Sequence, residues 1–332
     1  MTARVYESGR RLALAAGATA VHWIGGEALF ALSDGAVFAT PREGETRRIE
    51  AHGGTILSAA LHPDRARLVT GGDDGKLLAV SPAGDVTPIA TLRKWIDHVV
   101  THSALNLIVA GAGKEAIVFR DGKELHRFAH PSTVGGLALD AKGRRLAASH
   151  YGGVTLRYVL TADDKGSALN WAGSHLAVTI SPEADYVITG MQENALHGWR
   201  LPDKLDLRMD GYPTKTRSFS WDKRGRWLAT SGADSAIVWP FVGKNGPQGK
   251  APMQLIPREE FVVSAVAFHP NDETLAIGYS DGAVWLARFA DQAVIELDER
   301  GEGPVSALAW SDDGKHIACG DEAGRGAIID AP

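Results

Sequence analysis

Short apolar runs alternate with turn residues along this chain. Between Leu61 and Val80, the sequence LHPDRARLVTGGDDGKLLAV holds two such runs, ARLVTG and KLLAV, on either side of Gly-Gly-Asp-Asp-Gly. Short runs rich in branched and apolar residues, bounded by Gly, Pro and Asp, are typical of β-strands. The segment therefore predicts a strand, a tight turn and a second strand.

The same pattern of strands and turns returns along the whole chain. We align the copies on the residue that precedes the first turn of each copy, called the anchor below. The eight anchors are Trp23, Leu61, Thr101, Leu139, Ile180, Trp221, Phe268 and Trp310. Neighbouring anchors lie about 38 to about 47 residues apart, a period typical of four-stranded propeller blades. The sequence therefore predicts tandem four-stranded units.

The repeat predicts an all-β fold. Because one small sheet cannot bury both of its faces, arranging many such sheets around an axis is a stable solution. We therefore expect a closed β-propeller of four-stranded antiparallel blades in a single domain of residues 1–332. Eight blades are predicted, with seven as the alternative if the first or third copy is miscounted. The expected blades are residues 16–52, 53–92, 93–130, 131–171, 172–212, 213–258, 259–300, and 301–332 together with 1–15.

The two ends of the sequence predict how the ring closes. The last copy, PVSALAWSDDGKHIACGDEAGRGAIIDAP, ends after three strands, and an extra run, ARVYESGRRLALAAG, precedes the first copy. Since a ring needs its last blade completed, this N-terminal run is predicted to supply the missing fourth strand.

At this point the chain resembles the WD40-repeat family over essentially its whole length. Such repeats carry a Gly-His before the first strand and a Trp-Asp after the third strand. This sequence keeps His52 and His130, each nine residues before an anchor, and Trp199 and Trp239 in third-strand positions. The aspartate after each of these tryptophans is missing. The resemblance implies a non-catalytic scaffold that binds other proteins through its loops.

Composition excludes several classes of protein. The chain has 332 residues, a net charge of −5 and one cysteine. A single cysteine cannot form an internal disulfide, and the acidic balance argues against a nucleic-acid partner. No apolar window is long enough for a membrane span, so no membrane partner is expected. The start, GRRLALAAGATA, mildly imitates a signal peptide, but its apolar stretch is short and mostly alanine. We therefore expect a cytoplasmic protein.

Motifs for catalysis or cofactor binding are not found. GAGKEA, at residues 111–116, lacks the first glycine of a phosphate-binding loop and leads into a predicted strand. No nucleophile elbow is present, and Cys319 falls in a predicted strand. We expect no enzyme activity, no catalytic residue and no cofactor. A weak metal site at His130, His150 and His175, which belong to neighbouring blades, is left open.

Aromatic residues outside the anchors are the candidate binding residues. Four of them fall in connections between blades, and Tyr151 falls at a hairpin tip predicted to lie on the same rim. Exposed aromatic side chains mark binding surfaces more often than chance would. The candidate partner-binding residues are Trp95, Tyr151, Trp171, Tyr212 and Phe261, with the interleaved Arg93, Lys94 and Lys215. The competing interpretation is that each aromatic ring packs into its own groove between blades.

These observations predict a non-catalytic, WD40-like scaffold that binds a protein or peptide on its loop-bearing rim. The alternative is a propeller that handles a small molecule or a metal at the rim or the axial opening. The identity of the partner and the oligomeric state stay open at this point.

Overall fold

The computed structural model describes residues 4–5, 9–243, 245–298 and 301–332. Within these ranges, β-strands and the turns between them make up the chain, together with a short 3₁₀ helix, η1 (Ser103–Leu105). No helix in this part of the chain has the length and apolar character needed to cross a bilayer.

The chain divides into two compact units, which we describe separately. The first unit comprises Met1–Leu32, Phe38–Thr46 and Tyr212–Pro332, and the second comprises Ser33–Val37 and Arg47–Gly211. The sheet of the first copy, in the order β3-β4-β5-β6, contains residues of both units. Its strands are β3 (Ala18–Ile24), β4 (Glu27–Leu32), β5 (Ala36–Pro41) and β6 (Arg47–Glu50).

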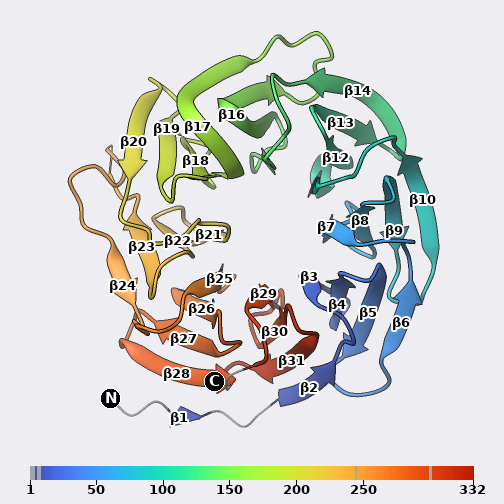
Figure 1. Ribbon diagram of the computed structural model, residues 1–332, viewed down its shortest axis with the longest axis vertical. Coiled ribbons are helices and arrows are strands. Elements are labelled where there is room, and N and C mark those ends of the chain that lie inside the picture. The colour runs from blue at the N-terminus through green and yellow to red at the C-terminus, as the bar shows by residue number, and fades with distance from the viewer. Residues whose placement is uncertain (1–3, 6–8, 244, 299–300) are drawn as a thin grey trace. The chain divides into compact units, whose positions relative to one another are not determined.

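The second unit holds copies two to five. Each copy supplies consecutive antiparallel strands, so neighbours in the sequence are neighbours in the sheet (Figure 1). The strands are β7 (Ile56–Leu61), β8 (Leu68–Gly72), β9 (Lys76–Val80), β10 (Val86–Thr91), β11 (His98–His102), β12 (Leu107–Ala112), β13 (Glu115–Arg120), β14 (Lys123–Ala129), β15 (Gly136–Leu139), β16 (Arg145–Tyr158), β17 (Ser167–Ile180), β18 (Tyr186–Met191), β19 (Leu196–Arg200) and β20 (Leu205–Met209).

The rest of the first unit holds copies six to eight and the N-terminal strands. Copy six forms the sheet β21-β22-β23-β24, and copies seven and eight are each extended by an N-terminal strand. The strands are β1 (Arg4–Val5), β2 (Gly9–Ala13), β21 (Phe219–Trp221), β22 (Trp227–Thr230), β23 (Ala236–Pro240), β24 (Met253–Leu255), β25 (Val263–Phe268), β26 (Thr274–Tyr279), β27 (Val284–Arg288), β28 (Ala293–Asp298), β29 (Val305–Trp310), β30 (His316–Asp321) and β31 (Arg325–Asp330).

The described strands form seven sheets, so the prediction of eight separate blades is wrong. The difference arises where copies four and five meet. β17 is a single 14-residue strand: Ser167–Asn170 and Ser174 pair with β16, and residues from His175 to Ile180 pair with β18. Because the strand continues through residues 171–174 instead of ending there, the two copies share one six-stranded sheet, β15 to β20 (Figure 1). The alternative count of seven therefore holds, although the merged copies are four and five rather than the first or the third copy.

The N-terminal strand completes the last sheet, as predicted. β2 pairs antiparallel with β31, with Arg11 opposite Ala327, in the sheet β2-β31-β30-β29. Leu12 and Leu14 are buried there. The predicted segment of residues 1–15 extends beyond β2, and its residues 1–3 and 6–8 lie outside the described residues.

Tight turns separate the second and third strands where the sequence has Asp-Gly. Gly75 has φ = +74°, and Gly282 has φ = +83°, a conformation that glycine adopts without steric cost. A Cβ atom at Gly75 would lie 2.4 Å from the carbonyl oxygen of Leu92. Glycine is therefore required at this turn both for its backbone conformation and for the close approach of the next connection.

Polar side chains on the first strand of each copy fasten neighbouring sheets together. Trp310 Nε1 donates to the carbonyl of Ala267 at 2.9 Å, and Thr101 Oγ1 donates to that of Leu61 at 2.6 Å. These side chains are the anchors of copies eight and three, and each bonds to the first strand of the copy before its own. Ser306, near the start of β29, donates to the carbonyl of Ala18 in the first copy at 2.6 Å. The polar residues that alternate with apolar ones in these strands therefore join one sheet to the next.

Candidate functional site: the connection edge

In the second unit, the connections between copies lie against the second-to-third-strand turns. Leu92 N donates to the carbonyl of Gly75 at 2.7 Å, and His130 N donates to that of Lys114 at 2.9 Å. Tyr151 N donates to Ser132 Oγ at 2.9 Å. We call the residues of these turns and connections, 72–75, 92–97, 112–115, 130–135, 150–153, 171–174 and 192–195, the connection edge. The predicted common rim of connections and hairpin tips is therefore present in this unit.

Two of the predicted binding residues are strongly exposed on the connection edge. Relative exposure is 63% for Trp95 and 68% for Tyr151. Trp95 is turned outward because the next residue, Ile96, is fully buried above Gly71, where a Cβ atom would lie 2.5 Å from Ile96 Cγ2. Extended neighbours point to opposite sides, so burial of Ile96 exposes the indole of Trp95.

Cationic side chains accompany the exposed tryptophan. Arg93 and Lys94 are exposed in the same connection as Trp95. Lys94 lies along the turn of copy three, since a Cβ atom at Gly113 would lie 2.9 Å from Lys94 Nζ. Lys114 in that turn is also exposed. An aromatic ring and three cations are thus presented together on a short stretch of the edge.

Trp171 lies beside a hollow on the same edge, but it is only partly exposed. Its ring stacks on His197, with centroids 3.9 Å apart and an interplanar angle of 16°. The hollow has a volume of about 470 Å³. Its lining residues are Trp171, Ala172, Met191, Glu193, Asn194, Ala195, Leu196, His197, Arg208, Asp210 and Gly211. Trp171 therefore covers a buried histidine as well as lining a concave surface.

His197 is held neutral and oriented beneath Trp171. Burial lowers its pKa, although the hydrogen bond to Asp206 partly opposes that effect. Nε2 lies 3.1 Å from Asp206 Oδ1, so in the neutral ring Nε2 carries the proton. Asp206 thereby fixes the orientation of the ring on which the Trp171 indole rests.

Tyr212 is not on the surface, so the expectation of an exposed ring there is wrong. Its side chain is buried, and its hydroxyl lies 2.7 Å from Thr230 Oγ1. Trp239 Nε1 donates to the same hydroxyl at 2.7 Å. Burial raises the pKa of Tyr212 to about 12, so the hydroxyl stays protonated. Tyr212 fastens the connection before β21 to the second and third strands of its own sheet.

His52 occupies the corresponding position of copy two and has the same role. Its Nε2 lies 2.8 Å from Thr70 Oγ1, and its Nδ1 lies 2.9 Å from Asp74 Oδ1. His52 and Tyr212 both stand nine residues before an anchor, and Thr70 and Thr230 both stand nine residues after one. His52, Thr70 and Asp74 are thus joined in one hydrogen-bonded network in copy two. The spacing that Tyr212 shares with His52 was the sequence signal that its side chain is buried.

Phe261 and Lys215 are both only partly exposed. Phe261 lies beneath Arg258, whose guanidinium carbon is 4.6 Å from the ring centroid. Arg258 also forms a two-point ion pair with Asp281, at 2.9 and 2.7 Å, and lies over the Tyr279 ring at 4.7 Å. Arg258 was not among the predicted residues. Asp281 stands thirteen residues after its anchor, as Asp74 does. This spacing was the signal that Asp281 accepts hydrogen bonds from a residue in the preceding connection.

Two of the three histidines considered for a metal site bond to threonine side chains, and the third is buried. His150 Nε2 lies 2.8 Å from Thr155 Oγ1, and His175 Nδ1 lies 2.8 Å from Thr189 Oγ1. The ring of His130 is buried, and its pKa is lowered to about 4, first by burial and then by the nearby His150 and Arg157. Within the part of the chain that the structure describes, no three His, Cys, Asp or Glu side chains are arranged to hold a metal ion.

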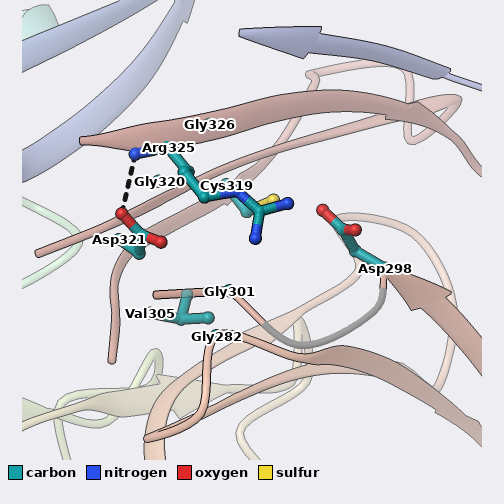
Figure 2. Close-up of a pocket in the computed structure, with 9 residues that line it drawn as sticks. All are labelled: Gly282, Asp298, Gly301, Val305, Cys319, Gly320, Asp321, Arg325 and Gly326. Carbon is teal, nitrogen blue, oxygen red and sulfur yellow. Dashed lines mark hydrogen bonds between the residues drawn. The ribbon is translucent and has the colours of Figure 1, made fainter. Parts of the chain in front are cut away.

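Cys319 lines a small cavity of about 20 Å³ in the first unit. In Figure 2, the Arg325 guanidinium points into this cavity on the side of Asp298, and Asp321 accepts the Arg325 backbone N–H at 2.7 Å. Such a volume holds about one water molecule. Burial raises the pKa of the Cys319 thiol to about 12, so the sulfur is protonated and a poor nucleophile at neutral pH.

Repeated antiparallel sheets of this kind define an all-β protein of the β-propeller class. Two family models match parts of the sequence: "WD domain, G-beta repeat" over residues 44–78, and "Anaphase-promoting complex subunit 4 WD40 domain" over residues 266–332. An uncharacterised WD repeat-containing protein of Schizosaccharomyces pombe is 34% identical over 70 residues, covering 20% of this chain and 12% of that protein. The chain therefore matches WD40 repeats at residues 44–78 and 266–332.

Two further similarities extend over most of the chain. Autophagy-related protein 16 of Arabidopsis thaliana is 22% identical over an alignment of 294 residues that covers 83% of this chain and 56% of that protein. The crystal structure of the computationally designed Ika8 protein superposes with a TM-score of 0.78, at 16% identity and 98% coverage of both chains. At this identity the structural match concerns the fold. The chain spans about an eighth and about half of the lengths of the two natural relatives.

Proposed function

We propose that this protein is a non-catalytic scaffold that binds a protein or peptide on the connection edge, centred on Trp95 and Tyr151. One observation carries the proposal: two large aromatic side chains, each more than three-fifths exposed, lie on the same edge of the second unit. Aromatic rings with low conformational freedom are frequent energetic centres of protein interfaces. WD40 propellers are typical protein-interaction scaffolds, which agrees with this assignment.

The charges around Trp95 indicate the chemistry of the partner. Arg93, Lys94 and Lys114 are exposed, and none of the three has an ion-pair partner among the described residues. A segment with an apolar side chain flanked by acidic residues would match this surface, because the cations attract the acids while the indole removes apolar area from water. Binding is therefore expected to weaken as salt increases.

Capture of partners from a lysate of the source cells tests the site. We expect the double variant Trp95→Ala/Tyr151→Ala to retain less than about one tenth of the main partner captured by the wild type, since interface centres contribute 2 kcal/mol or more each. Captured proteins are identified and quantified by mass spectrometry. Trp171 is left intact, because its loss would uncover His197.

The control removes two exposed apolar side chains from another part of the same unit. Leu125 and Leu160 are exposed at 47% and 41% and do not belong to the connection edge. Leu125→Ala/Leu160→Ala is expected to capture the partner as the wild type does. If the two double variants capture it equally, the site assignment is overturned.

We also propose that the sheets form a closed ring fastened by β2. The pairing of β2 with β31 and the bond from Ser306 to Ala18 support this closure, because they join copy eight to both the N-terminal strand and copy one. Deleting residues 1–15 removes β2 and exposes the edge of β31, so association through that edge is expected. Size-exclusion chromatography with light scattering reports it. A truncated chain that stays monomeric, with an unchanged melting temperature, contradicts the closure.

A further inference from the structure

A second concave surface of the second unit lies away from the connection edge. It is formed where the strands of copies four and five end at their third-to-fourth-strand turns, at the other end of the strands from Tyr151. The pocket has a volume of about 320 Å³. Its lining residues are Arg145, Leu156, Arg157, Tyr158, Asp164, Gly166, Ser167, Leu169, Leu201 and Lys204.

Positive charge is concentrated at this pocket. Arg145, Arg157 and Lys204 line it together with a single carboxylate, Asp164. The whole chain has a net charge of −5, so this excess of cations runs against the overall charge. Three cations that converge on one hollow repel one another unless an anion lies between them.

The existing contacts leave much of this positive charge unneutralised. Asp164 turns its carboxylate toward the protein and accepts the Tyr158 backbone N–H at 2.9 Å. Arg157 donates to the backbone carbonyl of Asp164, and its buried Nε has no hydrogen-bond partner among the described residues. Lys204 Nζ has one long contact, 3.4 Å, with the carbonyl of Ala168. The side chain of Arg145 has neither a hydrogen bond nor an ion pair within the described ranges of the chain.

The turn is built so that the guanidinium of Arg157 lies close to it. Gly166 has φ = +75°, and a Cβ atom there would lie 3.0 Å from both Cδ and Nε of Arg157. The ring of Phe128 supports the same side chain from below, with 5.2 Å between the guanidinium carbon and the ring centroid. Arg157 is therefore fixed in place at the pocket before any ligand arrives.

Apolar side chains form another part of the lining. Leu156, Leu169 and Leu201 line the pocket and belong to one apolar cluster with Trp199. A small inorganic anion would leave this surface in contact with water. An anion attached to an apolar body would cover it and gain the free energy of burial.

We infer that this pocket binds a phosphate monoester carried on an apolar body. Two negative charges match several cations better than the single charge of a carboxylate does, and guanidinium groups donate two parallel hydrogen bonds to phosphate oxygens. Arg157 and Arg145 would contact the phosphate, Lys204 would add charge, and the three leucines would contact the apolar body. The pocket is independent of the connection edge, so the two proposals fail or succeed separately.

Calorimetric titration of the full chain with phenyl phosphate tests the inference. We expect binding at one site with Kd below about 1 mM, and a Kd at least about fivefold higher for inorganic phosphate, which cannot contact the leucines. A Kd above that limit for phenyl phosphate, or equal affinity for inorganic phosphate, overturns the assignment.

Charge variants locate the site. Arg145→Gln/Lys204→Asn removes two lining cations; asparagine is chosen because it tolerates the φ of +55° at Lys204. The Kd for phenyl phosphate is expected to rise at least about tenfold, the scale of a lost charge-assisted hydrogen bond. Lys142→Gln/Arg144→Gln removes the same charge from exposed neighbours outside the pocket and is expected to change Kd less than about twofold. Equal effects of the two double variants overturn the site.

A last comparison distinguishes the two sources of such a group. A short peptide with a central phosphotyrosine carries the same phosphate and ring as phenyl phosphate. At least about tenfold tighter binding of the peptide indicates a phosphorylated protein as the source. Affinities within about twofold of each other indicate a small phosphate ester, and both results support the anion pocket.

Discussion

The connection at Tyr212 and the connection at Trp95 show two outcomes for an aromatic residue between sheets. Tyr212, nine residues before its anchor, points inward and bonds Thr230 and Trp239. Trp95, six residues before its anchor, points outward and is 63% exposed. In these two connections, distance from the anchor therefore separates a side chain that fastens the sheets from one that is free to meet a partner.

The same comparison extends to other chemical groups. At nine residues before the anchor, copy two has His52, bonded to Thr70 and Asp74. In copy seven, Arg258 stands ten residues before the anchor and pairs with Asp281. Histidine, tyrosine and arginine thus perform one task, which is to tie a connection to the sheet beside it. The position of the fastening residue stays within one residue while its chemistry varies.

The largest loss of stability is expected from a substitution of Arg258. Arg258→Met keeps the apolar stem but removes the ion pair with Asp281, two mostly buried partners. Breaking a buried pair of this kind costs about 3 kcal/mol, and the lost contacts with aromatic rings add to it. The midpoint of urea unfolding measures the loss. Arg93→Met, at an exposed position, should leave the midpoint unchanged, and equal shifts would show that position relative to the anchor does not matter.

Substitutions of Tyr212 are expected to cause the next largest loss in the free energy of unfolding. Tyr212→Ala removes a buried ring and both of its hydrogen bonds, at a cost of about 3 kcal/mol. Tyr212→Phe removes only the hydroxyl and should cost about 1 to 2 kcal/mol, because Trp239 Nε1 loses its acceptor. Both losses are measured by urea unfolding. A phenylalanine variant as stable as the wild type would contradict the fastening role of the hydroxyl.

His130 shares the position of His52, but neither of its ring nitrogens has a hydrogen-bond partner among the described residues. Its contribution to stability is therefore expected to depend on pH. The pKa of His130 is lowered to about 4, mainly by burial, whereas it is about 6.5 in an unfolded chain. Between these values the unfolded chain binds a proton that the folded chain does not, so stability falls as pH falls from about 6.5 to about 4, by at most roughly 3 kcal/mol.

Urea midpoints at pH 6.8 and 4.5 measure this loss. His130→Asn removes the titrating group, so its midpoint should fall less between the two pH values than that of the wild type. The variant also loses some packing, but that loss is similar at both pH values and cancels in the comparison. Identical falls for variant and wild type would mean that His130 does not carry the pH dependence.

The smallest loss of stability is expected from a substitution of Trp95. Trp95→Ala removes an exposed side chain, and such surface changes usually stay within about 0.5 kcal/mol. The urea midpoint should therefore be close to that of the wild type, although the variant lacks a larger ring than Tyr212→Ala does. A loss above about 1 kcal/mol would show that the indole has a structural role.

Much of the fold follows from the sequence, because period-two alternation and Asp-Gly turns are local signals. The N-terminal completion of the last sheet was likewise predicted from a missing strand. The joining of copies four and five was not, because Trp171–Ser174 contains a glycine and a serine that suggest a turn, while pairing on both sides keeps it extended.

The candidate site was predicted in part. Trp95 and Tyr151 are exposed as expected, and Tyr212 is not, because its hydroxyl finds Thr230 on the same sheet. Residue type alone does not distinguish the buried Tyr212 from the exposed Trp95 and Tyr151. The nine-residue spacing that Tyr212 shares with His52 does distinguish it. The anion pocket depends on three cations from separate strands and turns, and no local pattern in the sequence brings them together.

Hydroxyl-radical footprinting of the free protein, read by mass spectrometry, tests the central distinction most directly. It reports the solvent accessibility of each aromatic ring in a single sample. We expect Trp95 and Tyr151 to be oxidised at least about tenfold faster than Tyr212 and Trp239, whose side chains are more than nine-tenths buried. Comparable rates at the four residues would contradict the division of connection residues into fastening and partner-facing positions.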